Sequence, residues 1–195
     1  MQEYESILDK TKLQDNIRFA ALFIMNFECL KDYLVSQMRG FFCDSYSEID
    51  GQFQIIESKE YLDIVKKLDP KRNKLTAALA WYKELGAINQ DDIDLFYRSR
   101  NRRNSITHEF AQELLKGFSE HDYDLFNSML NFYRKLDKWW IVEMEIPFID
   151  DEILEQYDQD KVVGGQAAIL TIINDVAMDK EDAFESLRAL LGDKN

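Results

Sequence analysis

The chain has 195 residues, of which 46% are hydrophobic while only seven are glycine and two are proline, a composition typical of one mostly helical domain with at most a small appendage. Its 24 basic and 37 acidic residues leave a formal charge of −13, which excludes a protein that coats nucleic acid non-specifically but allows a local basic site. Two cysteines, Cys29 and Cys43, argue against a disulfide framework, and no apolar run approaches the roughly 20 residues that span a bilayer. Because the N-terminus carries acids where a signal peptide would carry basic residues, we expect a cytoplasmic protein without a transmembrane segment.

The first predicted helix runs over 11–39. A Thr-x-x-Gln pattern at Thr11 and Gln14 has the form of a capping box, and Gly40 follows the last periodic residue. Apolar residues occupy most of the circumference of this helix. We therefore expect it to be buried on more than one side.

The segment 41–58 breaks the helical pattern. Its Asp50-Gly51 pair stands between two short mixed runs, which predicts a small β-hairpin or an irregular loop. Beyond it, apolar periodicity together with Gly and Pro stops predicts four more helices, over 59–67, 73–85, 91–116 and 120–141.

Acidic residues are concentrated near the C-terminus, where eight acids and no base lie between Glu143 and Asp160. They predict an acidic connector over 143–165, followed by short amphipathic helices over 166–178 and 180–191. The expected organisation is all-α, with a helical body over 1–142 that carries a small loop or hairpin insertion at 41–58, then the connector, and then a C-terminal helical appendage over 166–195.

Basic residues gather within the helix predicted over 91–116. The sequence Arg98-Ser-Arg-Asn-Arg-Arg-Asn-Ser-Ile-Thr-His108 holds four arginines, a histidine and no acid. Arginine presents a planar set of hydrogen-bond donors that suits phosphate, and histidine exchanges protons near neutral pH. The stretch therefore predicts a site that acts on a phosphodiester.

A helical wheel places this stretch in the middle of an apolar stripe. Ile93, Phe96 and Tyr97 define the stripe at the start of the helix. At its other end the stripe is continued by Ala111, Leu114, Leu115 and Phe118. The residues predicted to interrupt it are Arg100, Asn104, Thr107 and His108, with Arg103 at the edge and with Arg98 and Arg102 on the opposite face.

Two interpretations of this interruption stay open. One is an ordinary charged helix turn with a hydrogen-bonded histidine. The other is a working site, because polar groups on a face that a helix buries lose solvation unless they are paired or functional.

The residues Arg103-Asn104-Ser-Ile-Thr-His108 resemble the Arg-polar-x-x-x-His motif of the HEPN superfamily, the higher eukaryotes and prokaryotes nucleotide-binding domains. Members of this family are small bundles of four or five helices. Many are metal-independent endoribonucleases of toxin–antitoxin, abortive-infection and CRISPR-associated systems. The resemblance covers residues 11–142 and accounts neither for the insertion at 41–58 nor for the chain after Glu143.

The resemblance implies an endoribonuclease that acts in stress response or phage defence. Arg103 and His108 would be its catalytic pair, with Asn104 as the polar residue beside the arginine. RNA would be bound by Arg98, Arg100, Arg102 and Thr107. No metal or other cofactor is expected. The implied partners are RNA, a second copy of the chain in a homodimer, and an antitoxin or inhibitor protein.

One position departs from the family. Some members place a tyrosine that an antitoxin modifies two residues after the histidine, and Phe110 stands there in this chain. Regulation at such a hydroxyl is therefore not expected.

The alternative function belongs to a different class. It is a non-catalytic HEPN-like module that binds a nucleotide or a partner protein. A further hypothesis is autoinhibition, in which the acidic segment from Glu143 to Asp160 lies near the arginines and mimics phosphate.

Overall fold

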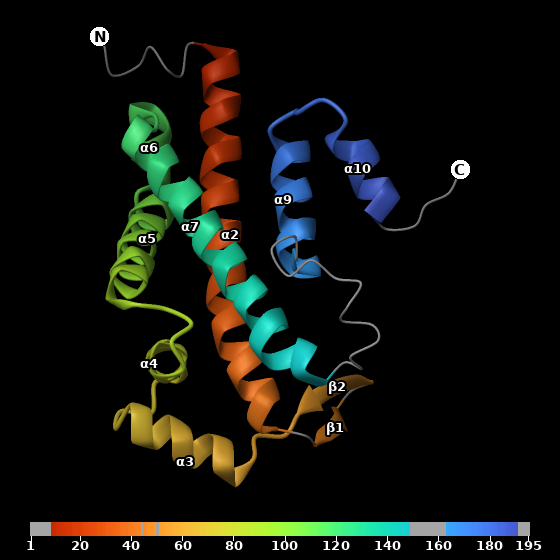
Figure 1. The fold of residues 1–195 in the computed structure, drawn as a ribbon. Helices are drawn as coiled ribbons and strands as arrows, with labels where there is room; N and C mark the ends of the chain where they lie inside the picture. The colour runs from red at the N-terminus through yellow and green to blue at the C-terminus, as the bar shows by residue number, and fades with distance from the viewer. Residues whose placement is uncertain (1–8, 44, 50, 149–162, 191–195) are drawn as a thin grey trace. The chain divides into compact units, whose positions relative to one another are not determined.

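The computed structural model describes residues 9–43, 45–49, 51–148 and 163–190, and Figure 1 shows its elements in chain order. Helices make up most of these residues, and the one sheet among them is a two-stranded hairpin. The predicted all-α fold with a small hairpin insertion is therefore confirmed. No helix within the described residues has both the length and the apolar character needed to cross a membrane.

The described residues divide into two compact units: those up to Phe27 together with those from Leu95 onward form the first, and those from Glu28 to Asp94 form the second. Helices α2 (Lys10–Phe42) and α5 (Gln90–His108) each run through the boundary. The other elements of the first unit are α6 (Phe110–Lys116), α7 (Glu120–Trp140), η2 (Ile141–Glu145), η3 (Ile146–Phe148), α9 (Gly165–Ala177) and α10 (Ala183–Leu190). The helices predicted as a C-terminal appendage thus belong to the same unit as α7.

Helix α2 begins one residue before the predicted start. Oδ1 of Asp9 accepts hydrogen bonds from the backbone N–H groups of Thr11 at 2.9 Å and of Lys12 at 3.2 Å. Asp9 therefore satisfies the first free donors of the helix, and the predicted capping box at Thr11 and Gln14 is wrong. The helix also continues through Gly40 to Phe42.

Aromatic side chains form much of the core of the first unit. Phe19 of α2 is 2% exposed, and its ring centroid lies 5.5 Å from that of Phe126 on α7. Further along α2, the ring centroid of Phe27 lies 5.3 Å from that of Phe96 on α5. These contacts place α5 and α7 against the N-terminal part of α2.

The end of α7 differs from the prediction. A π-helical turn, η2, follows it directly, with the N–H of Ile146 bonded to the carbonyl of Ile141, and the 3-10 turn η3 comes next. The predicted connector was to begin at 143, so helical structure reaches further than expected. The remainder of that connector, 149–162, lies outside the described residues.

The second unit contains the rest of α2, the hairpin and two helices. Strand β1 (Tyr46–Ile49) runs antiparallel to β2 (Gln52–Ile55), and Gly51 adopts a φ of 76° in the turn between them. This conformation favours glycine because it has no side chain to clash with the backbone. The two helices are α3 (Lys59–Leu68), capped by Ser58, and α4 (Lys74–Glu84), capped by Asn73.

Candidate functional site

The helix predicted over 91–116 is two helices. Helix α5 ends at His108, Glu109 has a non-helical ψ of 31°, and α6 begins at Phe110. The chain therefore changes direction directly after the histidine of the motif. The apolar residues that follow His108 do not continue the stripe of α5.

The buried face of α5 carries Phe96, Ser99 and Ile106. Their spacing of three and seven residues matches one side of a helix. Arg103 falls on the same side and is half-buried. The polar interruption of the buried face is thus narrower than predicted.

The predicted orientation of α5 is wrong by part of a turn. The prediction assumes one helix through residue 116, whereas the buried face of α5 is set by the packing of α5 alone. Several residues assigned to the buried stripe are exposed instead: Tyr97, Arg100, Thr107, His108 and Ala111. Arg98, predicted to face away from the stripe, is exposed as expected, whereas Arg102 is not.

Arg103 is held in place from two sides. Its guanidinium carbon lies 5.7 Å from the centroid of the Phe27 ring on α2, a cation–π arrangement. Nη1 donates a hydrogen bond of 3.0 Å to Oδ1 of Asn104. The structure thus brings together two of the three predicted catalytic residues.

His108 is the last residue of α5 and is exposed to solvent. A basic residue at this end of a helix lies near the partial negative charge of the helix dipole. The hydroxyl of Thr107 donates a hydrogen bond of 2.8 Å to the carbonyl of Arg103, so this predicted RNA-binding group is bonded to its own helix. Of the predicted RNA-binding arginines, Arg98 and Arg100 are exposed.

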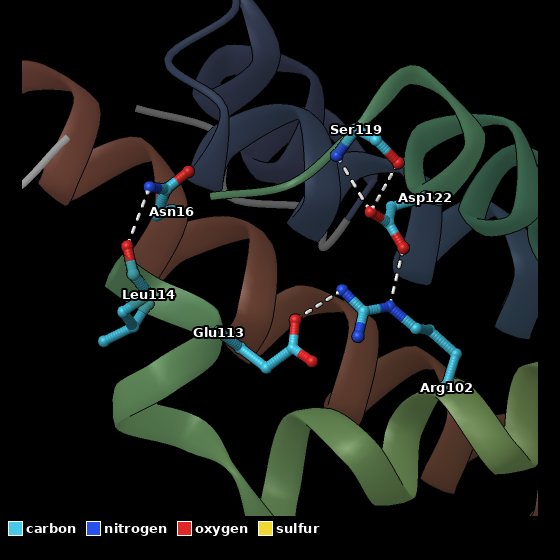
Figure 2. Close-up of polar contacts among 6 residues, drawn as sticks. All are labelled: Asn16, Arg102, Glu113, Leu114, Ser119 and Asp122. Carbon is cyan, nitrogen blue, oxygen red and sulfur yellow. Dashed lines mark hydrogen bonds and ion pairs between the residues drawn. The ribbon is translucent and has the colours of Figure 1, made fainter. Parts of the chain in front are cut away.

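Arg102 has a structural role that the sequence did not reveal. As Figure 2 shows, it reaches from α5 to two carboxylates on different helices. Nη2 lies 2.7 Å from Oε2 of Glu113 on α6, and Nε lies 2.6 Å from Oδ1 of Asp122 on α7. The hydrogen bond to Glu113 and the contacts with Asp122 raise the pKa of Arg102, although burial opposes the change. The guanidinium is therefore already engaged by protein groups.

Asp122 also closes the first turn of α7. Its Oδ2 accepts hydrogen bonds from both the backbone N–H and the hydroxyl of Ser119, each at 2.8 Å. Nearby, Nδ2 of Asn16 donates to the carbonyl of Leu114 at 3.3 Å, which ties α2 to α6 (Figure 2). We call the ion-paired group of Arg102, Glu113 and Asp122 the Arg102 clamp.

Only half of the clamp had a signal in the sequence. A Ser followed three residues later by Asp is a helix-start pattern, and it occurs at Ser119 and Asp122. Nothing in the spacing of Arg102 and Glu113 indicates that they meet. Among the described residues no group of three or more His, Cys, Asp or Glu side chains is arranged to hold a metal ion.

Comparisons of the chain with models of protein families, with curated proteins and with solved structures found no match.

Proposed function

We propose that the chain is a metal-independent endoribonuclease of the HEPN type that acts as a homodimer. One observation carries the proposal: an arginine fixed by Phe27 and Asn104 lies five residues before an exposed histidine at the end of the same helix. An arginine with restricted motion suits phosphate binding, and an accessible histidine suits proton transfer.

RNA supplies its own nucleophile, the 2′-OH beside the scissile phosphate. In the proposed reaction His108 of one subunit removes the proton from this hydroxyl, and O2′ forms a bond to phosphorus. The bond from phosphorus to O5′ breaks, and His108 of the second subunit protonates the leaving O5′. The products are a 2′,3′-cyclic phosphate and a 5′-hydroxyl.

In the same proposal Arg103 stabilises the negative charge that develops on the phosphate oxygens. Its bond to Asn104 uses one donor of the guanidinium, and an arginine has five. Arg98 and Arg100, both exposed, guide the RNA backbone. Arg102 takes no part in binding RNA, because its Nε and Nη2 groups are bonded to Asp122 and Glu113.

The helix geometry supports a second subunit in this proposal. Five residues correspond to a rotation of about 140° around a helix, so Arg103 and His108 of one chain diverge. One chain also offers a single motif histidine, whereas the reaction uses both a base and an acid. Two copies that place their motifs opposite each other supply both.

A non-catalytic binding module is the second candidate. The half-burial of Arg103 against Phe27 favours it, because a guanidinium used for packing has less freedom to reach a phosphate. Such a module binds a nucleotide or a partner protein and has no cleavage activity.

Cleavage of a labelled RNA pool in EDTA tests the proposal. The matched control uses the chain's other histidine, His121, which is also exposed. We expect wild type and His121→Ala to produce fragments that end in a 2′,3′-cyclic phosphate, and His108→Ala to produce none. Equal cleavage by wild type and His108→Ala would reject the role of His108. Absence of cleavage by all three proteins would favour the module.

The oligomeric state is tested separately by sedimentation of the wild-type chain at the concentrations used for cleavage. We expect a dimer. A monomer that cleaves RNA would contradict the shared site.

A further inference from the structure

A cleft of about 420 Å³ lies between α7 and α9 in the first unit, away from the motif on α5. Volumes of this size are within the range of small-molecule sites. Its walls include residues from one stripe of α7, Tyr123, Asn127, Leu130 and Arg134, and from one stripe of α9, Thr171 and Asn174. The cleft is therefore a groove between two helix faces.

The helices are held together at one end of this groove. Oδ2 of Asp137 on α7 accepts the backbone N–H of Ala167 on α9 at 2.9 Å. A Cβ on Gly164, just before α9, would lie 1.9 Å from the same oxygen, so a larger residue would displace the carboxylate that bonds to α9. Further along the same two helices, Tyr123 of α7 and Asp175 of α9 line the groove.

Helix α9 cannot close the groove by moving toward α7, because it is bonded to α2. The side-chain amides of Asn26 and Asn174 exchange hydrogen bonds of 2.7 and 3.0 Å, and both residues are buried. Buried amides that lose such partners are left unsatisfied, which is unfavourable. The groove is thus part of the folded architecture.

Aromatic rings line one part of the groove. The ring centroid of Phe19 lies 4.4 Å from that of Tyr123 and 5.5 Å from that of Phe126. Tyr123 is 37% exposed, so part of its ring is available for contact with a ligand. A flat apolar ring is the group that packs best against such a wall.

A cation lines the opposite part. Nη1 of Arg134 donates to Oδ1 of Asn131 at 3.2 Å, and Nη2 donates to the hydroxyl of Thr171 at 3.1 Å. Both acceptors are neutral, and among the described residues no carboxylate pairs with Arg134. These two hydrogen bonds therefore orient the guanidinium at the wall of the groove, and no described carboxylate neutralises its positive charge.

The remaining charges of the groove cancel. Lys180 forms an ion pair with Asp175, at 2.5 Å, and both residues line the groove. With Arg134 the lining carries one net positive charge, on a chain whose formal charge is −13. The net positive charge of the groove lining favours an anionic ligand.

We propose that this groove binds a small elongated anion whose aromatic ring packs near Tyr123 and Phe126 and whose anionic group pairs with Arg134. Arg134 lies eight positions after Phe126, which corresponds to about 12 Å along the helix. The ligand therefore has a spacer between its ring and its charge. Asn127 and Asn131 offer hydrogen-bonding amides along that spacer. The proposal is independent of RNA cleavage.

Two sources share this chemistry, a nucleoside monophosphate and an aromatic carboxylic acid with an aliphatic spacer. Calorimetric titration of the full chain with adenosine 5′-monophosphate and with indole-3-butyrate distinguishes them. Adenosine, which lacks the charge, and inorganic phosphate, which lacks the ring, serve as control ligands. We expect one of the two anions to bind, and the tighter one identifies the anionic group.

Two variants and one control test whether the anion binds in this groove. Arg134→Gln removes the cation from an exposed position and should weaken the anion about tenfold, because a charge-assisted hydrogen bond is lost. Tyr123→Ala should weaken it about fivefold through loss of the ring contact. Lys66→Gln on α3 removes the same charge from an exposed residue outside the groove and should leave affinity unchanged.

Three results would overturn the proposal. They are no saturable heat at about 5 mM of either anion, equal affinity of wild type and Arg134→Gln, and binding of adenosine or inorganic phosphate as tight as that of the complete anion.

Discussion

Nη2 of Arg102 lies 2.7 Å from Oε2 of Glu113, although the two residues are eleven positions apart in the chain. In one continuous helix that separation would correspond to about 16 Å of rise, beyond the reach of the two side chains. The break at Glu109 is what allows them to meet. The same break ends α5 at His108, so the Arg102 clamp joins the two helices on either side of the point where the chain leaves the candidate site.

Replacement of Arg102 should destabilise the fold. Arg102→Gln leaves two carboxylates, on residues that are 7% and 8% exposed, without their cation. Loss of one member of a buried ion pair typically lowers the free energy of unfolding by about 3 kcal/mol. Urea denaturation measures the change, and Arg98→Gln, an exposed arginine on the same helix, should stay within about 0.5 kcal/mol of wild type. Equal urea midpoints for Arg102→Gln and Arg98→Gln would contradict the clamp.

The clamp should also make stability depend on pH. Burial alone would raise the pKa of Asp122, but hydrogen bonds from Ser119 and Arg102 outweigh it and lower the pKa from its ordinary value of 3.8. A carboxyl group whose pKa is lower in the folded chain stabilises the fold above its unfolded-state pKa, and this contribution is lost as pH falls through its folded-state pKa.

The difference in unfolding free energy between wild type and Asp122→Asn should therefore be constant from about pH 7 to about pH 5 and shrink below about pH 4. Urea titrations at each pH measure it. If the difference stays the same down to about pH 3, Asp122 does not supply the pH dependence.

Two adjacent glycines should respond in opposite ways to alanine. At Gly164 a Cβ would collide with Asp137, so Gly164→Ala should lower the free energy of unfolding by about 2 kcal/mol or more and separate α9 from α7. At Gly165 nothing lies within 4 Å of the added carbon, and alanine should raise stability by about 0.5 kcal/mol because the helix is favoured. Thermal unfolding of the two variants makes the comparison. Similar melting temperatures for both would contradict the close approach at Gly164.

RNA binding should depend on the exposed arginines of α5. In the inactive His108→Ala background, Arg100→Gln should weaken binding to a single-stranded RNA and reduce the slope of log affinity against log salt concentration by about 0.7, as expected for one lost phosphate contact. Fluorescence anisotropy at several salt concentrations measures both quantities. Lys66→Gln serves as the control for net charge. If it changes the slope as much as Arg100→Gln does, the arginine makes no specific contact.

Local features of the sequence were enough to predict most elements. The helices expected over 59–67, 73–85 and 120–141 correspond to α3, α4 and α7 within one or two residues. The Asp50-Gly51 pair correctly indicated the hairpin between Tyr46 and Ile55. These features were predictable because capping, turn formation and apolar periodicity depend on residues that are neighbours in the chain.

The candidate site was predicted less well, because the face of α5 is chosen by distant residues. Arg103 lies half-buried against Phe27, and Arg102, one of the residues expected to bind RNA, is ion-paired with the two carboxylates of the clamp. His108 was expected within a helix and lies at its end.

By itself, then, the sequence determined the helical class, the hairpin and the presence of arginine and histidine at motif spacing, since each depends on local pattern. The tertiary structure alone decided that Arg102 is ion-paired and that Arg103 lies against Phe27. It also decided that Arg98 and Arg100 are exposed. In the same way it decided that α7 and α9 line a groove in which Arg134 has no carboxylate partner among the described residues. These outcomes arise from contacts between residues far apart in the chain, whose partners no local spacing reveals.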